Sequence, residues 1–417
     1  MNPDRSTEVL VVGAGPVGLF TALCLAESGV AVEVIDKYHR AASHSYALAL
    51  HPRTLRLLNE FGLADTLIGL GQKVGRVVLH QGEARLAELN LSTLEAPFNF
   101  VLVLPQSLLE AALERGLRDR GVRVVWNHPV LTFDSDPRGV HAIVAKTREV
   151  RGGYPVVRSE RTEVSTLPIR SSFLVGADGY LSLTRRMLGV DYEDLGGLTG
   201  YGLIEFTAPL RARDQVDLVF HDGSTDVLWP VGPDRGRWSV QLPDLEEHRD
   251  IDTLRGMIRS RAPWFDFDFG EVHWMATVCF DRRLAKRFGD GRVWLAGDAA
   301  HLTLPAGAQS MNIGLQEAYD LAERMTAILR EGRPVSVLRD YDRERREEWK
   351  RLLGLDGGLH PLPGAPKWSK ALAGRLLSSL PATGDDLGRL LEQVGLRFSR
   401  PRCRRGSSSV ASIGESC

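Results

Sequence analysis

The sequence predicts an α/β fold in which a Rossmann-type domain is interleaved with a mostly antiparallel β-sheet domain and followed by C-terminal helices. Three observations predict it. Residues 8–36 read as a strand, a glycine-rich turn, a helix and a second strand, which is the βαβ unit that opens a Rossmann domain. Two later buried strands, 173–176 and 292–296, each open onto an aspartate. Between them, residues 190–280 are rich in short strands separated by turn residues.

Composition is that of an ordinary globular protein. Lys plus Arg total 52 and Asp plus Glu total 53, so the net charge is -1, which argues against a protein that binds a nucleic-acid backbone. No apolar run reaches the ~20 residues of a membrane-spanning helix. The cysteines Cys24, Cys279, Cys403 and Cys417 are scattered without a CxxC pair. We therefore expect no metal site, no disulfide scaffold and a reducing, cytoplasmic location.

The remaining elements follow in order along the chain. Apolar periodicity ending at a glycine predicts helices at 53–61 and 106–120, and residues 74–104 read as short strands. Further helices are predicted at 253–260, 312–330 and 335–353, hairpins at 135–166, and two short helices after Gly354. The resulting division is 1–73, 105–185 and 286–354 for the Rossmann-type domain, 74–104 and 186–285 for the second sheet, 355–403 for C-terminal helices and 404–417 for a disordered tail.

The turn after the first strand carries the dinucleotide-binding fingerprint. Gly13 permits the tight turn, Gly15 lets the backbone approach a pyrophosphate, and Gly18 lets the following helix pack close to the sheet. Asp36, 23 residues after Gly13, is in the right window to accept hydrogen bonds from a ribose 2′-OH. An acid at this position disfavours a 2′-phosphate. The motif therefore predicts FAD or NAD rather than NADP, without distinguishing the first two.

Two aspartates follow the later buried strands. Asp178 and Asp298 stand at carboxyl ends of strands, where open α/β sheets bind ligands. Small residues at 306–308 let the backbone approach a planar ligand, and the N–H groups of Met311 and Asn312 are placed to donate to a carbonyl on it. This pattern suits a flavin, whose ribityl hydroxyls would meet Asp298. The alternative is that Asp298 is an ordinary helix N-cap.

Three separated motifs resemble those of the group A flavoprotein monooxygenases, the aromatic and polyketide hydroxylases with a p-hydroxybenzoate hydroxylase-like fold. The motifs are VVGAGPVGL with its terminal acid, FLVGADGYLSLTRRMLG, and RVWLAGDAAHLTLPAGAQSMNIGLQEAYDLA, and the resemblance spans residues 8–350. It implies FAD as cofactor and NADH or NADPH with O₂ as co-substrates. The implied reaction is hydroxylation of an aromatic or polycyclic, polyketide-like small molecule through a flavin C4a-hydroperoxide. The alternatives are a flavin oxidoreductase without oxygen insertion and a non-catalytic flavin-binding protein.

The resemblance also implies roles for individual residues. Asp298 would hold the ribityl chain, and Pro305 would lie over the flavin. Gln106 would contact the phosphate–ribityl region, and Asp178 would belong to a motif that serves both FAD and the pyridine nucleotide. No protein acid or base and no metal is assigned, because the cofactor carries the chemistry.

One position departs from the family pattern. Relatives commonly carry an arginine that touches the FAD diphosphate where this chain has Tyr46, within the segment SYALALHPRTL. Either Arg53 or Arg40 supplies the missing positive charge, or FAD is held more weakly.

The predicted substrate face lies on one strand. The run from Arg237 to Leu242 alternates with period two, so Arg237, Ser239 and Gln241 share one face. By the resemblance this strand lines the substrate pocket, and Trp229 on the preceding strand is placed to stack on a flat substrate. The alternative is a polar face that simply meets water.

Overall fold

The computed structural model describes residues 5–39, 49–152, 158–208, 214–245, 250–265 and 270–398. The predictions made for Arg40, Tyr46 and the tail 404–417 lie outside the described residues.

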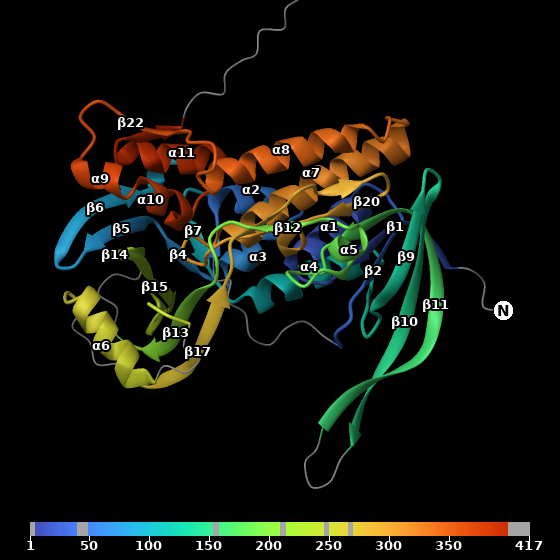
Figure 1. Cartoon of the computed structure of the whole chain (residues 1–417), viewed down its shortest axis with the longest axis horizontal. Coiled ribbons are helices and arrows are strands. Elements are labelled where there is room, and N and C mark those ends of the chain that lie inside the picture. The colour runs from blue at the N-terminus through green and yellow to red at the C-terminus, as the bar shows by residue number, and fades with distance from the viewer. Residues whose placement is uncertain are drawn as a thin grey trace, which may run out of the picture.

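A mostly parallel sheet forms the core of the Rossmann-type domain (Figure 1). Its strand order is β19-β20-β11-β1-β2-β8, in which β19 pairs antiparallel with β20 and the other neighbours pair in parallel. Residues 9–12 are buried because both faces of the sheet are covered. The strands are β1 (Arg5–Val12), β2 (Val32–Ile35), β8 (Val124–Val125), β11 (Arg158–Gly176), β19 (Gly289–Asp290) and β20 (Val293–Leu295).

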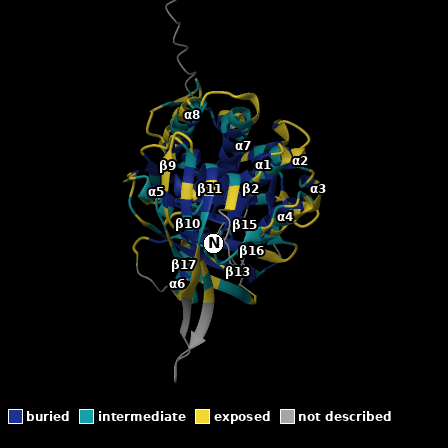
Figure 2. Cartoon of the chain, turned by 90° about the vertical axis from the view of Figure 1, so that its right-hand side faces the viewer, coloured by how far each residue is buried: buried dark blue, intermediate teal, exposed yellow. Residues whose placement is uncertain are grey.

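Different layers cover the two faces of this sheet. Helices α1 (Pro16–Glu27), α4 (Gln106–Asp119) and α7 (Gln309–Glu331) pack on one face, where Val9 and Val11 join the main apolar core. Strands β9 (Val130–Asp136) and β10 (Gly139–Gly152) and helix α5 (Leu183–Met187) cover the other face, where Leu10 and Val12 point. Figure 2 shows the resulting band of buried residues through β2, β11 and α1.

The predicted hairpin region is one long ribbon. Strands β10 and β11 pair antiparallel from Val140 with Ser171 outward, and their far ends project away from the body of the protein (Figure 1). The inner end of β11 instead joins the parallel sheet beside β1.

The second sheet is mostly antiparallel, as predicted. Its order is β17-β13-β16-β15-β14-β5-β6, and only β14 and β5 among these neighbours pair in parallel. Helix α6 (Ile251–Arg261) covers one face with a core cluster that includes Trp238 and Val240. The opposite face turns toward the Rossmann-type domain. The strands are β5 (Arg76–Gln81), β6 (Ala84–Asn90), β13 (Thr199–Thr207), β14 (Gln215–His221), β15 (Ser224–Gly232), β16 (Arg235–Gln241) and β17 (Val272–Phe280).

Shorter elements connect and cap the two sheets. The C-terminal helices are α8 (Val337–Leu352), α9 (Lys367–Ala371), α10 (Ala373–Ser379) and α11 (Gly384–Gln393). Three short helices therefore follow Gly354 in the described chain where two were predicted, because α9 and α10 are separated by a turn at Leu372. Within the described chain, none of the helices has the length and apolarity needed to span a bilayer. The other elements are α2 (Pro52–Glu60), α3 (Ala64–Ile68), η1 (Leu91–Thr93), η2 (Gly297–Ala299), β3 (Ala49–Leu50), β4 (Gln72–Val74), β7 (Val101–Val103), β12 (Tyr192–Asp194), β18 (Arg283–Ala285), β21 (His301–Leu302), β22 (Leu359–Pro361) and β23 (Leu396–Phe398).

Candidate cofactor and substrate site

One cavity of about 700 Å³ is lined by residues from both sheets. The Rossmann-type domain contributes the glycine turn after β1, the end of β2, the start of α4 and the segments that follow β11 and β20. The seven-stranded sheet contributes the side chains of Leu203, Trp229, Ser239 and Phe280. A ligand in this cavity therefore contacts both domains at once.

Glycine is needed at the three fingerprint positions for different structural reasons. Gly13 has φ +108°, and a Cβ there would overlap the carbonyl of Ala177, while a Cβ on Gly18 would overlap the carbonyl of Gly13. Packing within the protein therefore requires glycine at both positions. A Cβ on Gly15 would meet no atom within 4 Å, so this glycine leaves open space at the N-terminus of α1. Free N–H groups and the helix dipole favour an anion such as a diphosphate there.

Asp36 connects the end of β2 to the glycine turn. Its Oδ2 accepts a hydrogen bond from the Ala14 N–H at 2.7 Å, and its Oδ1 accepts one from the Tyr38 N–H at 2.7 Å. The carboxylate also lines the cavity. Each oxygen has further lone pairs, so Asp36 is able to accept from a ribose hydroxyl while it holds the turn.

Gln106 lies at the start of α4 on the same wall of the cavity. Its Nε2 donates to Oε1 of Glu110 at 2.7 Å, and Glu110, which is only 3% exposed, also lines the cavity. Burial raises the pKa of Glu110 to about 7; the Gln106 hydrogen bond opposes this shift and the Asp36 carboxylate adds to it. The sequence analysis missed Glu110, although its i,i+4 spacing from Gln106 places both on one helix face.

The two aspartates after β11 and β20 organise their own turns differently. Asp178 accepts from the Ser182 hydroxyl at 2.5 Å and from the Thr184 N–H at 3.0 Å, so its carboxylate is largely engaged by the loop that it begins. Asp298 accepts a side-chain bond from Ser310 Oγ at 2.9 Å, and its carboxyl is exposed where it lines the cavity. The surrounding protein nonetheless raises the pKa of Asp298 by desolvation.

Asp298 is not the N-cap of the following helix. Helix α7 begins at Gln309, and Ala308, in the left-handed conformation with φ +50°, occupies the N-cap position without a side-chain hydrogen bond. The N-cap alternative considered for Asp298 is therefore wrong. Its carboxylate is left to face the cavity from the short turn η2.

Arg185 joins the two aspartate turns. Its Nη1 donates to the Ala299 carbonyl at 2.9 Å, and its Nη2 donates to the Tyr180 carbonyl at 3.0 Å. The guanidinium also stacks over the Tyr192 ring at 3.8 Å, and the Tyr192 hydroxyl donates to the Asp298 carbonyl at 3.0 Å. The segments after β11 and β20 are thus held at a fixed separation.

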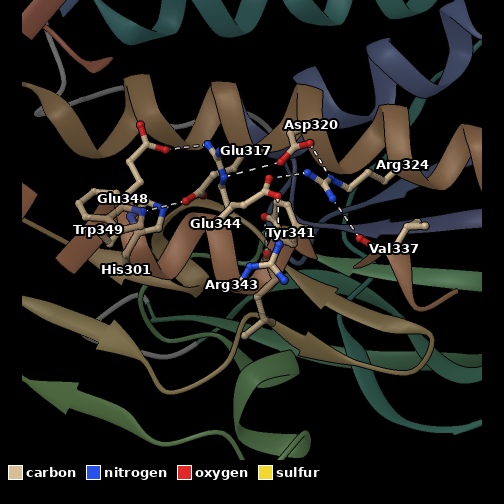
Figure 3. Close-up of polar contacts among 12 residues, drawn as sticks. His301, Glu317, Asp320, Arg324, Val337, Tyr341, Arg343, Glu344, Glu348 and Trp349 are labelled. Atoms are coloured by element: carbon tan, nitrogen blue, oxygen red, sulfur yellow. Dashed lines mark hydrogen bonds and ion pairs between the residues drawn. The ribbon is translucent and has the colours of Figure 1, made fainter. Parts of the chain in front are cut away.

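Glu317, a buried carboxylate of α7, supports the Asp298 turn from behind, and Figure 3 shows it beside His301 and Trp349. Glu317 Oε2 accepts from the Gly297 N–H at 3.0 Å and lies 2.7 Å from His301 Nε2, while its Oε1 accepts from Trp349 Nε1 at 2.8 Å. His301 and Glu317 are completely buried, and the His301 ring stacks on Trp349 at 3.9 Å. One side chain of α7 therefore fixes both ends of the turn that carries Asp298 and ties it to α8.

The segment 305–312 is anchored by His51. The His51 Nε2 lies 2.9 Å from the Gly307 carbonyl, and the His51 N–H donates to Asn312 Oδ1 at 2.8 Å. Burial lowers the pKa of His51 to about 3, so the ring is neutral. Pro305 and Met311 line the cavity, whereas the Asn312 side chain is fully buried and donates to the carbonyls of Ala49 and Ala308.

Strands β15 and β16 bring only part of the predicted substrate face to the cavity. Ser239 and Trp229 line it, whereas Arg237 and Gln241 do not. The Arg237 Nε donates to Glu205 Oε1 at 2.7 Å, and the Gln241 Oε1 accepts from the Thr225 N–H at 2.8 Å. These partners hold the two polar side chains against neighbouring strands of the sheet.

Of the two arginines predicted to supply positive charge, Arg53 and Arg40, only Arg53 is among the described residues. Arg53 lies on α2 with its guanidinium against Gly384 at the start of α11, and it is not among the residues that line the cavity. Lys37 and Arg186 do line it, and the sequence analysis singled out neither. Among the described residues, no group of three or more His, Cys, Asp or Glu side chains is placed to hold a metal ion.

Comparisons with known proteins agree with this geometry. Residues 6–354 match the FAD binding domain family. The chain is 31% identical over 352 residues to an uncharacterized aromatic compound monooxygenase of Bacillus subtilis (strain 168), covering 83% of this chain and 66% of that protein. It is 34% identical over 355 residues to 6-methylpretetramide 4-monooxygenase of Streptomyces rimosus, covering 83% of this chain and 60% of that protein. The chain thus spans less than two thirds of the length of both relatives.

The fold is also that of a solved hydroxylase structure. The p-nitrophenol 4-monooxygenase from Pseudomonas putida DLL-E4 superimposes with a TM-score of 0.74 at 22% identity, covering 94% of this chain and 97% of that one. The resemblance of the three sequence motifs to group A flavoprotein monooxygenases is confirmed. The glycine cradle, the open space at Gly15 and the carboxylates at the strand ends fit FAD. The chain belongs to the FAD binding domain family.

Proposed function

We propose that the protein is an FAD-dependent monooxygenase that hydroxylates an aromatic or polycyclic, polyketide-like small molecule with O₂ and NADH or NADPH. The observation that carries this proposal is the shared cavity, whose walls combine the nucleotide-binding turns with side chains of the second sheet. A flavin bound along the nucleotide-binding turns would lie next to the side chains that the second sheet contributes to the cavity.

The chain's own residues would bind and orient FAD. The N–H groups at the start of α1 and the open space at Gly15 suit the diphosphate, and Asp36 suits the adenosine ribose. Asp298 suits the ribityl hydroxyls, and the backbone at the start of α7, including the N–H of Met311, suits the flavin ring. When bound, FAD supplies the redox chemistry, and the protein positions it and excludes water.

The second wall would orient the substrate. Trp229 offers a flat aromatic surface, Leu203 and Phe280 offer apolar contacts, and Ser239 offers one hydroxyl. Roles for Arg237, Gln241, Arg53 and the Asn312 N–H stay predictions. We also propose a division into an FAD-binding part (1–73, 105–185, 286–354) and a substrate part (74–104, 186–285). Pairing of β5 with β14 in the seven-stranded sheet supports the assignment of 74–104 to the substrate part.

The names of the relatives support this class of substrate. Both are monooxygenases by name, and one of them acts on 6-methylpretetramide. We propose the same reaction class here, with a small aromatic molecule and O₂ as partners, no nucleic acid, and a cytoplasmic location that suits the scattered cysteines.

The test is NADH and NADPH oxidation by the FAD-loaded protein across a panel of phenols and polyketide aromatics. The proposal expects oxidation that is faster with one class of aromatic and that yields hydroxylated product. Oxidation with product that contains no added oxygen would favour the flavin oxidoreductase. No oxidation of either nucleotide under any condition would favour a non-catalytic flavin-binding protein.

A further inference from the structure

Glu110 is a buried acid in the wall of the FAD cavity that no predicted role uses. It lies one turn after Gln106 on α4, is 3% exposed, and lines the cavity together with Asp36. The neighbouring acid on the same helix, Glu114, is more exposed and pairs with Arg118 at 3.2 Å. The two glutamates therefore differ in environment although they share a helix.

The two oxygens of Glu110 are satisfied unequally. Oε1 accepts from Gln106 Nε2 at 2.7 Å, whereas Oε2 is inaccessible to solvent and has no hydrogen-bond partner among the described residues. An ionised carboxylate with one oxygen buried and unpartnered is strongly disfavoured, because its lost hydration is not replaced. Protonation at Oε2 removes the negative charge from this enclosed oxygen and so lowers the cost of its burial.

The charges around Glu110 favour the same protonation state. Burial raises its pKa to about 7, and the Asp36 carboxylate raises it further against the Gln106 hydrogen bond. FAD adds a negatively charged diphosphate to this wall. The charged or titratable groups that line the cavity among the described residues, besides Glu110, are Asp36, Lys37, Tyr38, His128, Asp178, Tyr180, Arg186 and Asp298.

We propose that Glu110 takes up a proton at Oε2 when FAD binds, because the cofactor diphosphate adds negative charge to a wall that already holds the Asp36 carboxylate. FAD binding is then coupled to proton uptake. Below the pKa of about 7 the apoprotein already holds this proton, so the affinity is high. Above it, binding must recruit the proton, and the Kd rises by up to ~10-fold for each pH unit.

The test measures FAD Kd from pH 6 to pH 9 for the wild type, Glu110→Gln and the control Glu114→Gln. The amide introduced by Glu110→Gln keeps a donor but cannot ionise, so this variant should bind FAD at least ~10-fold more tightly than the wild type at pH 9. Glu114→Gln should follow the wild type. Any slope that remains in Glu110→Gln belongs to groups other than Glu110.

Calorimetry in buffers of different ionisation enthalpy provides a second readout. At pH 8 the wild type should take up nearly one more proton per FAD than Glu110→Gln does. An equal pH slope and equal proton uptake in the two proteins would overturn the proposal. Weaker FAD binding by Glu110→Gln at every pH would also overturn it, because Glu110 would then act as an ionised acceptor.

If Glu110→Gln does not fold, the wild type alone decides the matter. Infrared difference spectra of FAD binding at pH 8 should show the C=O stretch of a newly protonated carboxylic acid, and its absence would refute the proposal. The inference rests on FAD occupying this cavity, and so on the proposed function. A wild type that binds no FAD would refute that assignment, whereas FAD binding without proton uptake would refute the role of Glu110 alone.

Discussion

Two walls of the cavity are built by different means: the proposed cofactor wall, formed by the turns after β1, β11 and β20, and the proposed substrate wall, formed by Leu203, Trp229, Ser239 and Phe280. On the cofactor wall, backbone approach determines the residue type, as at Gly13 and Gly18, where any side chain would overlap a carbonyl. On the substrate wall, side chains of a buried sheet face determine the surface, and only some of them reach the cavity, such as Trp229 and Ser239. The shape of the cofactor wall therefore depends on steric constraints on the backbone, and the shape of the substrate wall depends on which partners its side chains contact.

This difference sets how each wall responds to substitution. A change on the cofactor wall or in its support should affect folding or FAD affinity, because backbone turns hold the cofactor. A change on the substrate wall should leave FAD bound and alter how the substrate is oriented. Four predictions examine this separation.

The largest effect is expected where the cofactor wall is supported from behind. Glu317→Ala removes the acceptor for the Gly297 N–H, for the His301 ring and for Trp349, all of which are buried. We expect a loss of ~3–5 kcal/mol in the free energy of unfolding, measured by urea denaturation of the apoprotein. As a control, Glu344→Ala removes partly exposed pairs with Arg324 and Arg343 in the same region (Figure 3) and should cost at most ~1 kcal/mol. Equal losses in the two variants would contradict this role of Glu317.

The glycine turn separates folding from cofactor binding. Gly18→Ala would drive a Cβ into the Gly13 carbonyl, so we expect a lower Tm of the apoprotein, equivalent to ~1–3 kcal/mol of overpacking. Gly15→Ala places its Cβ in open space and should keep the apoprotein Tm while weakening FAD binding. The measurements are apoprotein Tm and FAD Kd for both variants. An equal fall in Tm for Gly15→Ala and Gly18→Ala would contradict the assignment of Gly15 to cofactor binding and of Gly18 to packing.

Asp298→Ala should weaken FAD without unfolding the protein. The ribityl hydroxyls would lose a charged acceptor, and hydrogen bonds to charged groups contribute ~1.5–3 kcal/mol, or about ten- to hundredfold in affinity. FAD titration by flavin fluorescence measures the change. Ser310→Ala removes the 2.9 Å bond that orients Asp298 and a longer contact, 3.5 Å, with His301 Nδ1. It should have a smaller effect in the same direction. Unchanged flavin affinity in Asp298→Ala would refute the ribityl assignment.

Much of the cofactor wall could be predicted from the sequence, because each requirement there is local. The turn at Gly13, the acid at Asp36 and the aspartate after β20 all follow directly from a strand end. The hydrogen bond from the Gly297 N–H to Glu317 could not be predicted, because it depends on how α7 packs behind the Asp298 turn. Glu110 was missed because its burial is a property of the packed helix.

On the substrate wall, the period-two alternation of the strand predicted which face points toward the cavity, but not which side chains of that face line it. Trp238 and Val240 lie under α6, opposite to Ser239, as period two requires. The partners of Arg237 and Gln241 come from positions distant in sequence, Glu205 and Thr225, and depend on strand register. Register is set by tertiary packing, so the sequence alone does not specify which polar residue reaches a ligand.

The smallest effects are expected on the substrate wall. Trp229→Ala removes an aromatic surface worth ~0.5–1.5 kcal/mol, so substrate affinity should fall at most about tenfold while FAD stays bound. Ser239→Ala should change affinity only a few-fold, since a neutral hydrogen bond contributes roughly 1 kcal/mol. Both variants should lower the ratio of hydroxylated product to NAD(P)H consumed. A substrate held in the wrong orientation is not hydroxylated, although NAD(P)H is still oxidised. Wild-type ratios and affinities in both variants would mean that this sheet face does not contact the substrate.

The proposed function requires one cavity to bring FAD, O₂ and an aromatic substrate together for oxygen insertion. The most direct measurement is turnover under ¹⁸O₂ with the best substrate from the aromatic panel, followed by mass spectrometry of the product and quantification of NAD(P)H. The account predicts product that carries one ¹⁸O atom for each NAD(P)H consumed under coupled conditions. Product without the label, or NAD(P)H consumed with H₂O₂ as the sole oxygen product for every aromatic tested, would contradict it.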